Sequence, residues 1–229
     1  MPTEKKLDSR LLSALPYLTV GGVVADIGTD HAYLPIEILK REISKRAVAC
    51  DVNLGPIESA KRNIAAAGLT DRIDILQTDG LHGVRNYNPT DVVIFGMGGE
   101  LTVKILSEAE WIKREGISLI LQPMSHAEIL RGWLLKNGFS IQGEALTFED
   151  QYYQTIHAVY TGKTDSYTEE ELYYGKHILD GNSPYLTDFL KRKAQGLSKI
   201  IEGKEKGNAD TSLEKRLLDA ITRRLREKG

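Results

Sequence analysis

The sequence has a single cysteine, no apolar run long enough to cross a membrane, and almost no excess of either charge. One cysteine, Cys50, excludes an intrachain disulfide, and its place on a strand-like run indicates a small core residue. The formal net charge of the 229 residues is −2, so a nucleic-acid partner would have to bind a local basic surface. The first twelve residues have no long apolar core and no small-residue cleavage site, so we expect a cytoplasmic protein without a signal peptide.

Strand-like apolar runs alternate with amphipathic helix-like runs as far as about residue 160, which is typical of βαβ units in a mostly parallel sheet. An opening helix with an apolar face of Leu7, Leu11, Leu12 and Leu15 precedes the first strand. We expect strands at 23–28, 47–51, 72–77, 91–96 and 117–123. We expect helices at 33–41, 56–67, 99–109 and 126–138. Two further strand-like runs within 139–160 are expected to form an antiparallel hairpin.

From about residue 161 the sequence becomes polar, and after Pro184 leucine and isoleucine recur at coiled-coil spacing. We therefore expect an α/β domain over 1–162 and a helical domain over 163–229, with a helical hairpin at 185–229. Thr211 and Glu214 have the T-x-x-E spacing of a capping box at the start of the second helix.

This helical region is basic, because residues 186–229 hold 12 lysines and arginines against 7 aspartates and glutamates. Two clusters are candidates for RNA contacts: Lys191, Arg192 and Lys193, and Arg223, Arg224 and Arg226. Contacts with phosphate would make the affinity fall steeply with salt. The alternative is an ordinary solvated helix face.

The loop after the first strand reads Asp26-Ile27-Gly28-Thr29-Asp30-His31. A dinucleotide-binding loop would have further glycines, whose amides face a pyrophosphate. Here Asp30 stands where the second glycine would be, and two carboxylates repel phosphate but attract a cation. S-adenosylmethionine carries a sulfonium and an ammonium and no phosphate, so the loop favours this cofactor over NAD. The alternative is an Asx-type turn without a ligand.

Two more acids end the next two strands. Asp51 lies roughly 20 residues after Gly28, where an acid can accept both ribose hydroxyl protons. Asp79 could accept from the adenine amine. Each also has a local alternative, a helix cap ahead of Pro56 for Asp51 and a turn before Gly80 for Asp79. Because the carboxyl ends of parallel strands meet at one edge, these acids and Asp26 predict a single site.

Three glycines lie within the four residues Gly96-Met97-Gly98-Gly99, which follow the fourth strand directly. Such a segment exposes backbone amides and carbonyls to a flat ligand such as a base. The alternative is a tight turn into the helix at 99–109.

Five segments, ADIGTDHAYLP, GP-x-x-SA-x-x-N at 55–63, TDGL, FGMGG and LILQP, occur in a characteristic order and spacing. Together they resemble the bacterial tRNA (adenine(22)-N1)-methyltransferase family, TrmK, over about residues 5–160. Over 185–229 the resemblance rests on the helical pattern. It implies a Rossmann-like class I methyltransferase sheet and a coiled-coil-like C-terminal domain that grips tRNA. It further implies methylation of adenine N1, at position 22 of tRNA, with S-adenosylmethionine as donor.

The resemblance also implies roles for single residues. Asp30 matches the catalytic aspartate of the family, with capping of the 33–41 helix as its alternative role. The family has a glutamate where Asp51 stands, and an asparagine where Met124 stands. If that asparagine holds the base, Gln122 or Ser125 must take its role. We expect cofactor contacts from Asp26, Gly28, His31, Asp51, Val52, Asp79, Gly80, Leu81 and Gly96. We expect substrate contacts from Tyr33, Met97, Gly98, Gly99, Gln122 and Pro123.

Neither a metal nor a stable oligomer is expected. The histidines show no metal-ligand spacing, and no cysteine cluster accompanies them. Three hypotheses remain: a tRNA N1-adenine methyltransferase, a methyltransferase for another RNA, a small molecule or a protein, and a noncatalytic nucleotide-binding module. The basic hairpin and the glycine-rich fourth loop favour the first.

Overall fold

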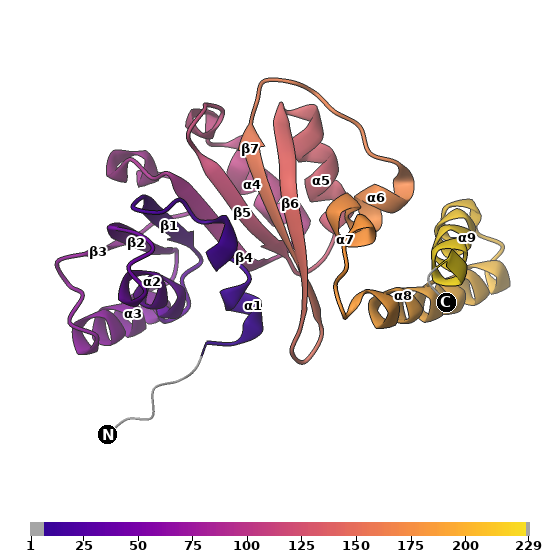
Figure 1. Cartoon of the computed structure of the whole chain (residues 1–229), viewed down its shortest axis with the longest axis horizontal. Helices are drawn as coiled ribbons and strands as arrows, with labels where there is room; N and C mark the ends of the chain where they lie inside the picture. Colours follow the sequence, from indigo (N-terminus) through magenta and orange to yellow (C-terminus); the bar gives the residue numbers. More distant parts are fainter. Residues whose placement is uncertain (1–6, 228–229) are drawn as a thin grey trace. The chain divides into compact units, whose positions relative to one another are not determined.

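The computed structural model describes residues 7–227 and divides the chain into two compact units, Met1–Ser166 and Tyr167–Gly229 (Figure 1). The expected boundary, between residues 162 and 163, lies in the same polar segment. Among residues 7–227 no helix is both long enough and apolar enough to span a membrane.

Unit 1 is built on a seven-stranded sheet with the strand order β3-β2-β1-β4-β5-β7-β6 (Figure 1). The strands are β1 (Val23–Ile27), β2 (Arg46–Asp51), β3 (Ile73–Gln77), β4 (Asp91–Met97), β5 (Ser118–Pro123), β6 (Phe139–Phe148) and β7 (Tyr152–Tyr160). The first five strands are parallel, and β7 is antiparallel to both β5 and β6. This arrangement confirms the α/β, Rossmann-like class I methyltransferase sheet. The order reverses at β1 and β4, and open α/β sheets bind ligands at such a point.

Helices cover both faces of the sheet. They are α1 (Ser9–Leu12), α2 (Tyr33–Lys40), α3 (Leu54–Ala66), α4 (Gly99–Ser107) and α5 (Ala127–Lys136), with 3-10 turns η1 (Leu15–Tyr17), η2 (Val84–Tyr87) and η3 (Glu110–Ile112). The crossovers from β1 to β2 and from β4 to β5 run in opposite directions along the sheet. Because crossovers between parallel strands are almost always right-handed, such connections place α2 and α4 on opposite faces. The central strands are therefore buried on both sides, and Val24, Val48 and Val92 are all fully buried.

The opening helix is shorter than expected. Asp8 caps α1 by accepting a hydrogen bond from the amide of Leu11 at 2.9 Å, but the helix ends at Leu12. The hydroxyl of Ser13 donates to the carbonyl of Arg10 at 2.7 Å and lies 2.6 Å from the hydroxyl of Thr155 on β7. This side chain competes with the helical pattern, and the chain continues as the 3-10 turn η1.

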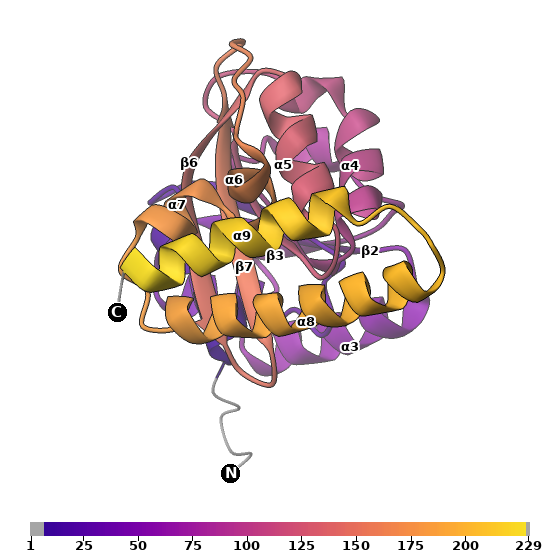
Figure 2. The same ribbon diagram turned by 90° about the vertical axis from the view of Figure 1, so that its right-hand side faces the viewer.

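Unit 2 consists of α6 (Glu169–Tyr174), α7 (Lys176–Asp180), α8 (Leu186–Lys206) and α9 (Ser212–Glu227). The helices α8 and α9 lie side by side and run in opposite directions, which confirms the helical hairpin (Figure 2). Phe189 and Leu190 of α8 are buried, as are Leu217 and Ile221 of α9. The two short helices α6 and α7 were not expected, because the sequence before Pro184 is mostly polar.

The capping box predicted at Thr211 is wrong. Asp210 accepts from the amide of Ser212 at 3.0 Å, and Glu214 pairs with Lys204 of α8 at 2.7 Å. The same T-x-x-E spacing at Thr168 forms the box instead, at the start of α6. Glu214 thus forms an ion pair with the neighbouring helix in place of the capping box that the local sequence predicts.

A buried ion pair joins α5 to the β6–β7 hairpin. Nε of Arg131 lies 2.6 Å from Oε1 of Glu144, and neither side chain is exposed to solvent. The same guanidinium donates to Oε1 of Gln154 at 2.8 Å. Removing one member of such a pair leaves a buried charge without its partner.

We predict that Glu144→Leu lowers the free energy of unfolding by about 3–5 kcal/mol, because Arg131 then stays buried and unpaired. The double variant Arg131→Met/Glu144→Leu should recover most of this loss, since it removes both charges. Urea denaturation of the three proteins measures the effect. A double variant as unstable as the single one would contradict the explanation by an unpaired charge.

Candidate active site

A cavity of about 490 Å³ opens where the sheet order reverses, at the carboxyl ends of β1 and β4. Its size is that of a typical small-molecule site. Six predicted site residues line it: Asp26, Gly28, Asp30, His31, Tyr33 and Gly96. Six residues that the sequence did not indicate line it as well: Leu7, Asp8, Arg10, Leu11, Leu34 and Phe95.

Two backbone amides of the first loop are already bonded within the protein. Gly28 N and Thr29 N both donate to the carbonyl of Cys50, each at 2.8 Å. Gly28 has a φ of +78°, and a Cβ there would lie 2.5 Å from Cε of Met97. The loop therefore folds tightly against β2 and β4 without turning these amides toward a ligand. A pyrophosphate would lack the donors that dinucleotide-binding loops supply.

Asp26 ends up buried in the wall of the cavity. Burial raises its pKa from 3.8 to about 6, and the nearby charge of Asp51 acts in the same direction. The positive charge of Arg10 acts in the opposite direction. A cation bound in the cavity would relieve the cost of keeping Asp26 ionised, because opposite charges at short range favour the charged form.

Asp30 lies on the exposed part of the loop, with 80% of its side chain accessible. Its Oδ1 is 3.2 Å from Nε2 of His31, whose ring stacks on Tyr33 with 5.3 Å between centroids. The alternative that Asp30 caps α2 does not hold, because Ala32 is the N-cap residue and no side chain caps the helix. The carboxylate therefore borders the cavity and lies beside a histidine.

The loop that carries Asp30 has an unusual backbone. His31 and Ala32 have φ values of +68° and +57°, although neither is a glycine. Such conformations cost of order 1–3 kcal/mol each and cluster at functional sites. Asn63 of α3 holds the loop by donating from Nδ2 to the carbonyl of His31 at 2.9 Å. This asparagine, which the sequence reasoning gave no role, ends the GP-x-x-SA-x-x-N segment.

Asp51 and Val52 lie at the carboxyl end of β2, outside the residues that line the cavity. One carboxylate oxygen of Asp51 accepts from the amide of Asn53 at 2.8 Å, but the alternative role as a helix cap is wrong, because Asn53 is the N-cap residue of α3 and no side chain caps this helix. Its other oxygen accepts no hydrogen bond from the described residues, which leaves an acceptor for a ligand. Val52 is apolar yet 53% exposed, as expected of a residue that a flat ring can cover.

The residues that follow β3 differ in their exposure to solvent. Asp79 is exposed at the end of the strand, whereas Leu81 is buried. Gly80 has a φ of +57°, and a Cβ there would lie 3.2 Å from Ile105 of α4. Gly80 and Leu81 thus fix the loop against α4, and Asp79 is the member of the group that a ligand can reach.

The glycine-rich segment also has two roles. Gly96 forms a bulge in β4, is exposed, and lines the cavity. Gly98 is the N-cap residue of α4, and Gly99 is packed so closely that a Cβ would lie 2.2 Å from the carbonyl oxygen of His126. The tight turn therefore accounts for Gly98 and Gly99, and the exposed backbone is that of Gly96.

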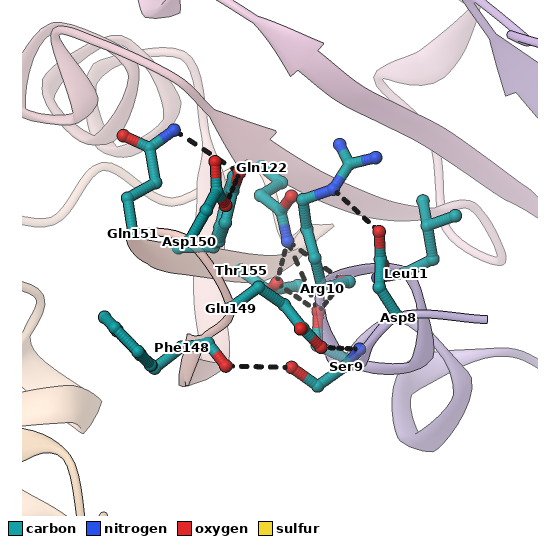
Figure 3. Close-up of polar contacts among 12 residues, drawn as sticks. Asp8, Ser9, Arg10, Leu11, Gln122, Phe148, Glu149, Asp150, Gln151 and Thr155 are labelled. Atoms are coloured by element: carbon teal, nitrogen blue, oxygen red, sulfur yellow. Dashed lines mark hydrogen bonds and ion pairs between the residues drawn. The ribbon is translucent and has the colours of Figure 1, made fainter. Parts of the chain in front are cut away.

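Gln122 is buried beneath the N-terminal segment (Figure 3). Its Nε2 donates to the hydroxyl of Thr155 at 2.9 Å and to the carbonyl of Arg10 at 3.2 Å. Pro123 next to it is buried too. In this arrangement the amide holds α1 in place, so a contact between Gln122 and a base would require α1 to move.

In unit 2, the predicted arginine cluster is largely paired with acids of α6. Glu170 accepts from Arg224 at 2.9 Å and from Arg223 at 3.2 Å. Lys191 of α8 is exposed and has no ion pair in the described part of the chain, and Arg192 and Lys193 beside it are exposed as well. Arg226 is also exposed, on α9. Lys191 is thus better placed to meet an external anion than Arg223 or Arg224.

The described residues contain no group of three or more histidines, cysteines, aspartates and glutamates that could hold a metal ion. The donors around the cavity instead suit an organic zwitterion. Asp26 and Asp30 suit positive groups, Arg10 suits a negative group, and the exposed Val52 suits a ring.

Comparisons with known proteins identify the family of the chain. The family model described as "TrmK: tRNA (adenine(22)-N(1))-methyltransferase" matches residues 24–226. The tRNA (adenine(22)-N(1))-methyltransferase of Bacillus subtilis is 34% identical over 97% of this chain and 95% of its own.

Solved structures extend the likeness to the cofactor. A Streptococcus pneumoniae protein in complex with S-adenosyl-L-methionine is 28% identical, with a TM-score of 0.85, over 96% of this chain and all of that one. M. capricolum TrmK in complex with S-adenosyl-homocysteine is 26% identical, with a TM-score of 0.77, over 97% of both chains. This chain therefore belongs to the TrmK family of tRNA (adenine(22)-N(1))-methyltransferases and uses S-adenosylmethionine as its cofactor.

Proposed function

We propose that this protein methylates N1 of adenine 22 in tRNA and that Asp30 is its catalytic carboxylate. The observation that carries the proposal is the first loop, in which two amides bond to the carbonyl of Cys50 while two carboxylates line the cavity. Such a loop disfavours phosphate-bearing cofactors and favours a cationic methyl donor. In the proposal, Asp51 holds the ribose, Asp79 the adenine amine, and Val52 covers the adenine ring.

When bound, S-adenosylmethionine supplies an electrophilic methyl group with a neutral thioether as leaving group. Adenine N1 carries an in-plane lone pair and is a sufficient nucleophile, so the enzyme has mainly to align the two reactants. Alignment can supply about 7–11 kcal/mol of the barrier. Methylation places positive charge on the base, and the Asp30 carboxylate stabilises that charge and can accept the proton lost from N6. His31 positions Asp30, and Tyr33 together with the backbone of Gly96 meets the base.

Adenine N1 lies on the Watson–Crick edge, so a stacked or paired base cannot reach the cavity. The base must therefore leave its stack, and the enzyme must hold the surrounding RNA while it does so. In the proposal, Lys191, Arg192 and Lys193 of α8 contact phosphates. The reaction needs no Lewis acid, because the sulfonium is already activated, and we propose a cytoplasmic monomer that works without a metal ion.

We predict that Asp30→Asn lowers the turnover number at least 100-fold, the lower end of what general acid–base catalysis contributes. The dissociation constant for S-adenosylhomocysteine should change less than threefold, because Asp30 acts on the base. Labelled methyl transfer to unmodified tRNA and calorimetry measure the two quantities. Asp71→Asn, at an exposed aspartate outside the cavity lining, is the matched control. Full activity of Asp30→Asn would refute the assigned role.

We predict that Asp26→Asn stabilises the protein but weakens cofactor binding. The folded-state pKa of about 6 exceeds the ordinary 3.8. Ionised Asp26 therefore destabilises the fold at neutral pH, and this cost disappears as the pH falls from about 6 toward 4. The variant should gain up to about 3 kcal/mol at pH 7.5, much less at pH 4.5.

Urea denaturation at the two pH values checks the stability of Asp26→Asn. Calorimetry with S-adenosylhomocysteine should show wild-type affinity falling below about pH 6, as Asp26 takes up a proton, and a flatter profile for the variant. If the variant gained the same stability at both pH values, the titration of Asp26 would not be the origin of that gain.

We predict that Lys191→Ala weakens tRNA binding and reduces the slope of log affinity against log salt by about 1. Arg223→Ala should change the slope less, because Glu170 already pairs with that guanidinium. Filter binding over a series of salt concentrations gives both slopes. The reverse order of the two effects would place the RNA contacts on α9 instead.

A further inference from the structure

We propose that Arg10 of the N-terminal segment binds the α-carboxylate of the methionyl group of S-adenosylmethionine. This contact would let the site distinguish the complete cofactor from adenosine thioethers that lack a carboxylate. The inference rests on the use of this cofactor, and it assigns a residue that lies outside the sequence motifs described above.

The side chain of Arg10 lies close to two residues of the site, Gly96 and Asp26. It lines the cavity, and its Nη1 lies 3.8 Å from the position of a Cβ built on Gly96. Its charge also acts on Asp26, because it lowers the pKa that burial raises. The guanidinium is thus near both the end of β1 and the bulge of β4, which are the two strand ends that form the cavity.

The charges of the cofactor require a partner of this kind. Its methionyl end carries an ammonium and a sulfonium, which suit Asp26 and Asp30, and also a carboxylate, which those acids repel. Of the described residues that line the cavity, Arg10 alone carries a permanent positive charge. A planar guanidinium can bind a carboxylate through two parallel hydrogen bonds.

The contacts of Arg10 leave its guanidinium donors available. Its Nε lies 3.7 Å from Oδ2 of Asp8, which exceeds hydrogen-bond distance, and its Cζ lies 5.5 Å from the ring centre of Tyr153. Exposed ion pairs of this length contribute little to stability. A ligand carboxylate inside the cavity can therefore replace the contact with Asp8 at small cost.

The backbone around Arg10, in contrast, is fixed (Figure 3). Its carbonyl accepts from the hydroxyl of Ser13 and from Nε2 of Gln122. Ser9 next to it bonds through its amide to Glu149 and through its hydroxyl to the carbonyl of Phe148. The β6–β7 hairpin thus holds the segment in place, while the side chain of Arg10 extends from a fixed backbone.

The test compares two ligands by calorimetry: S-adenosylhomocysteine, and the same thioether with its carboxyl group removed. Wild-type protein should bind the complete ligand about 10- to 100-fold more tightly, the range expected for a charged hydrogen-bonded pair. Arg10→Met keeps the packing of the stem and should reduce this ratio to within about threefold. It should do so by weakening the binding of the complete ligand alone. Arg10→Lys should restore part of the ratio.

Arg41→Met is the matched control, since Arg41 pairs with Glu37 on α2 and lies outside the cavity lining. It should leave the ratio of the two affinities unchanged. The proposal would be overturned if Arg10→Met weakened the binding of both ligands equally, or weakened the binding of neither. A wild-type protein that binds neither ligand would instead contradict the cofactor assignment itself.

Discussion

Two hydrogen bonds to one carbonyl decide what the site can hold. The amides of Gly28 and Thr29 both donate to the oxygen of Cys50, and so these two amides are not turned toward a phosphate. In dinucleotide-binding proteins the equivalent amides and the following helix end attract an anion. Here the groups left facing the cavity are carboxylates, and the same β1–loop–α2 unit therefore prefers a cation. The choice of cofactor follows from the hydrogen bonding of the loop.

The features that favour a cationic cofactor destabilise the fold. Asp26 is buried with a raised pKa, and His31 and Ala32 adopt left-handed conformations that side chains disfavour. Such features persist only where the surroundings determine them. The strands β1 and β2, which are buried except at their end residues, supply that support from below, and the bond from Asn63 to the carbonyl of His31 supplies it from α3. The strained loop can therefore present Asp30 to a substrate while the residues beneath it stay fixed.

The sequence predicted those parts of the site that depend on strand ends. The parallel strands follow from alternating apolar runs, and Asp26, Asp30 and Gly96 meet because the carboxyl ends of such strands share one edge. The place of Arg10 could not be predicted, since it depends on a bond to Gln122, 112 positions away in the chain. Likewise, the T-x-x-E motif occurs twice, and only the ion pair between Lys204 and Glu214 decides which copy forms a capping box.

The antiparallel hairpin explains why the N-terminal segment can belong to the site at all. A segment that precedes the first strand has no sheet partner of its own, and α1 has only four residues. Its fixed position comes from β7, where Thr155 meets both Ser13 and Gln122, and from Glu149 at the tip of the hairpin. The hairpin thus supports one wall of the cavity through side chains that lie outside the cavity lining. Since Gln122 lies within the LILQP segment, part of what that motif encodes is the support of this wall.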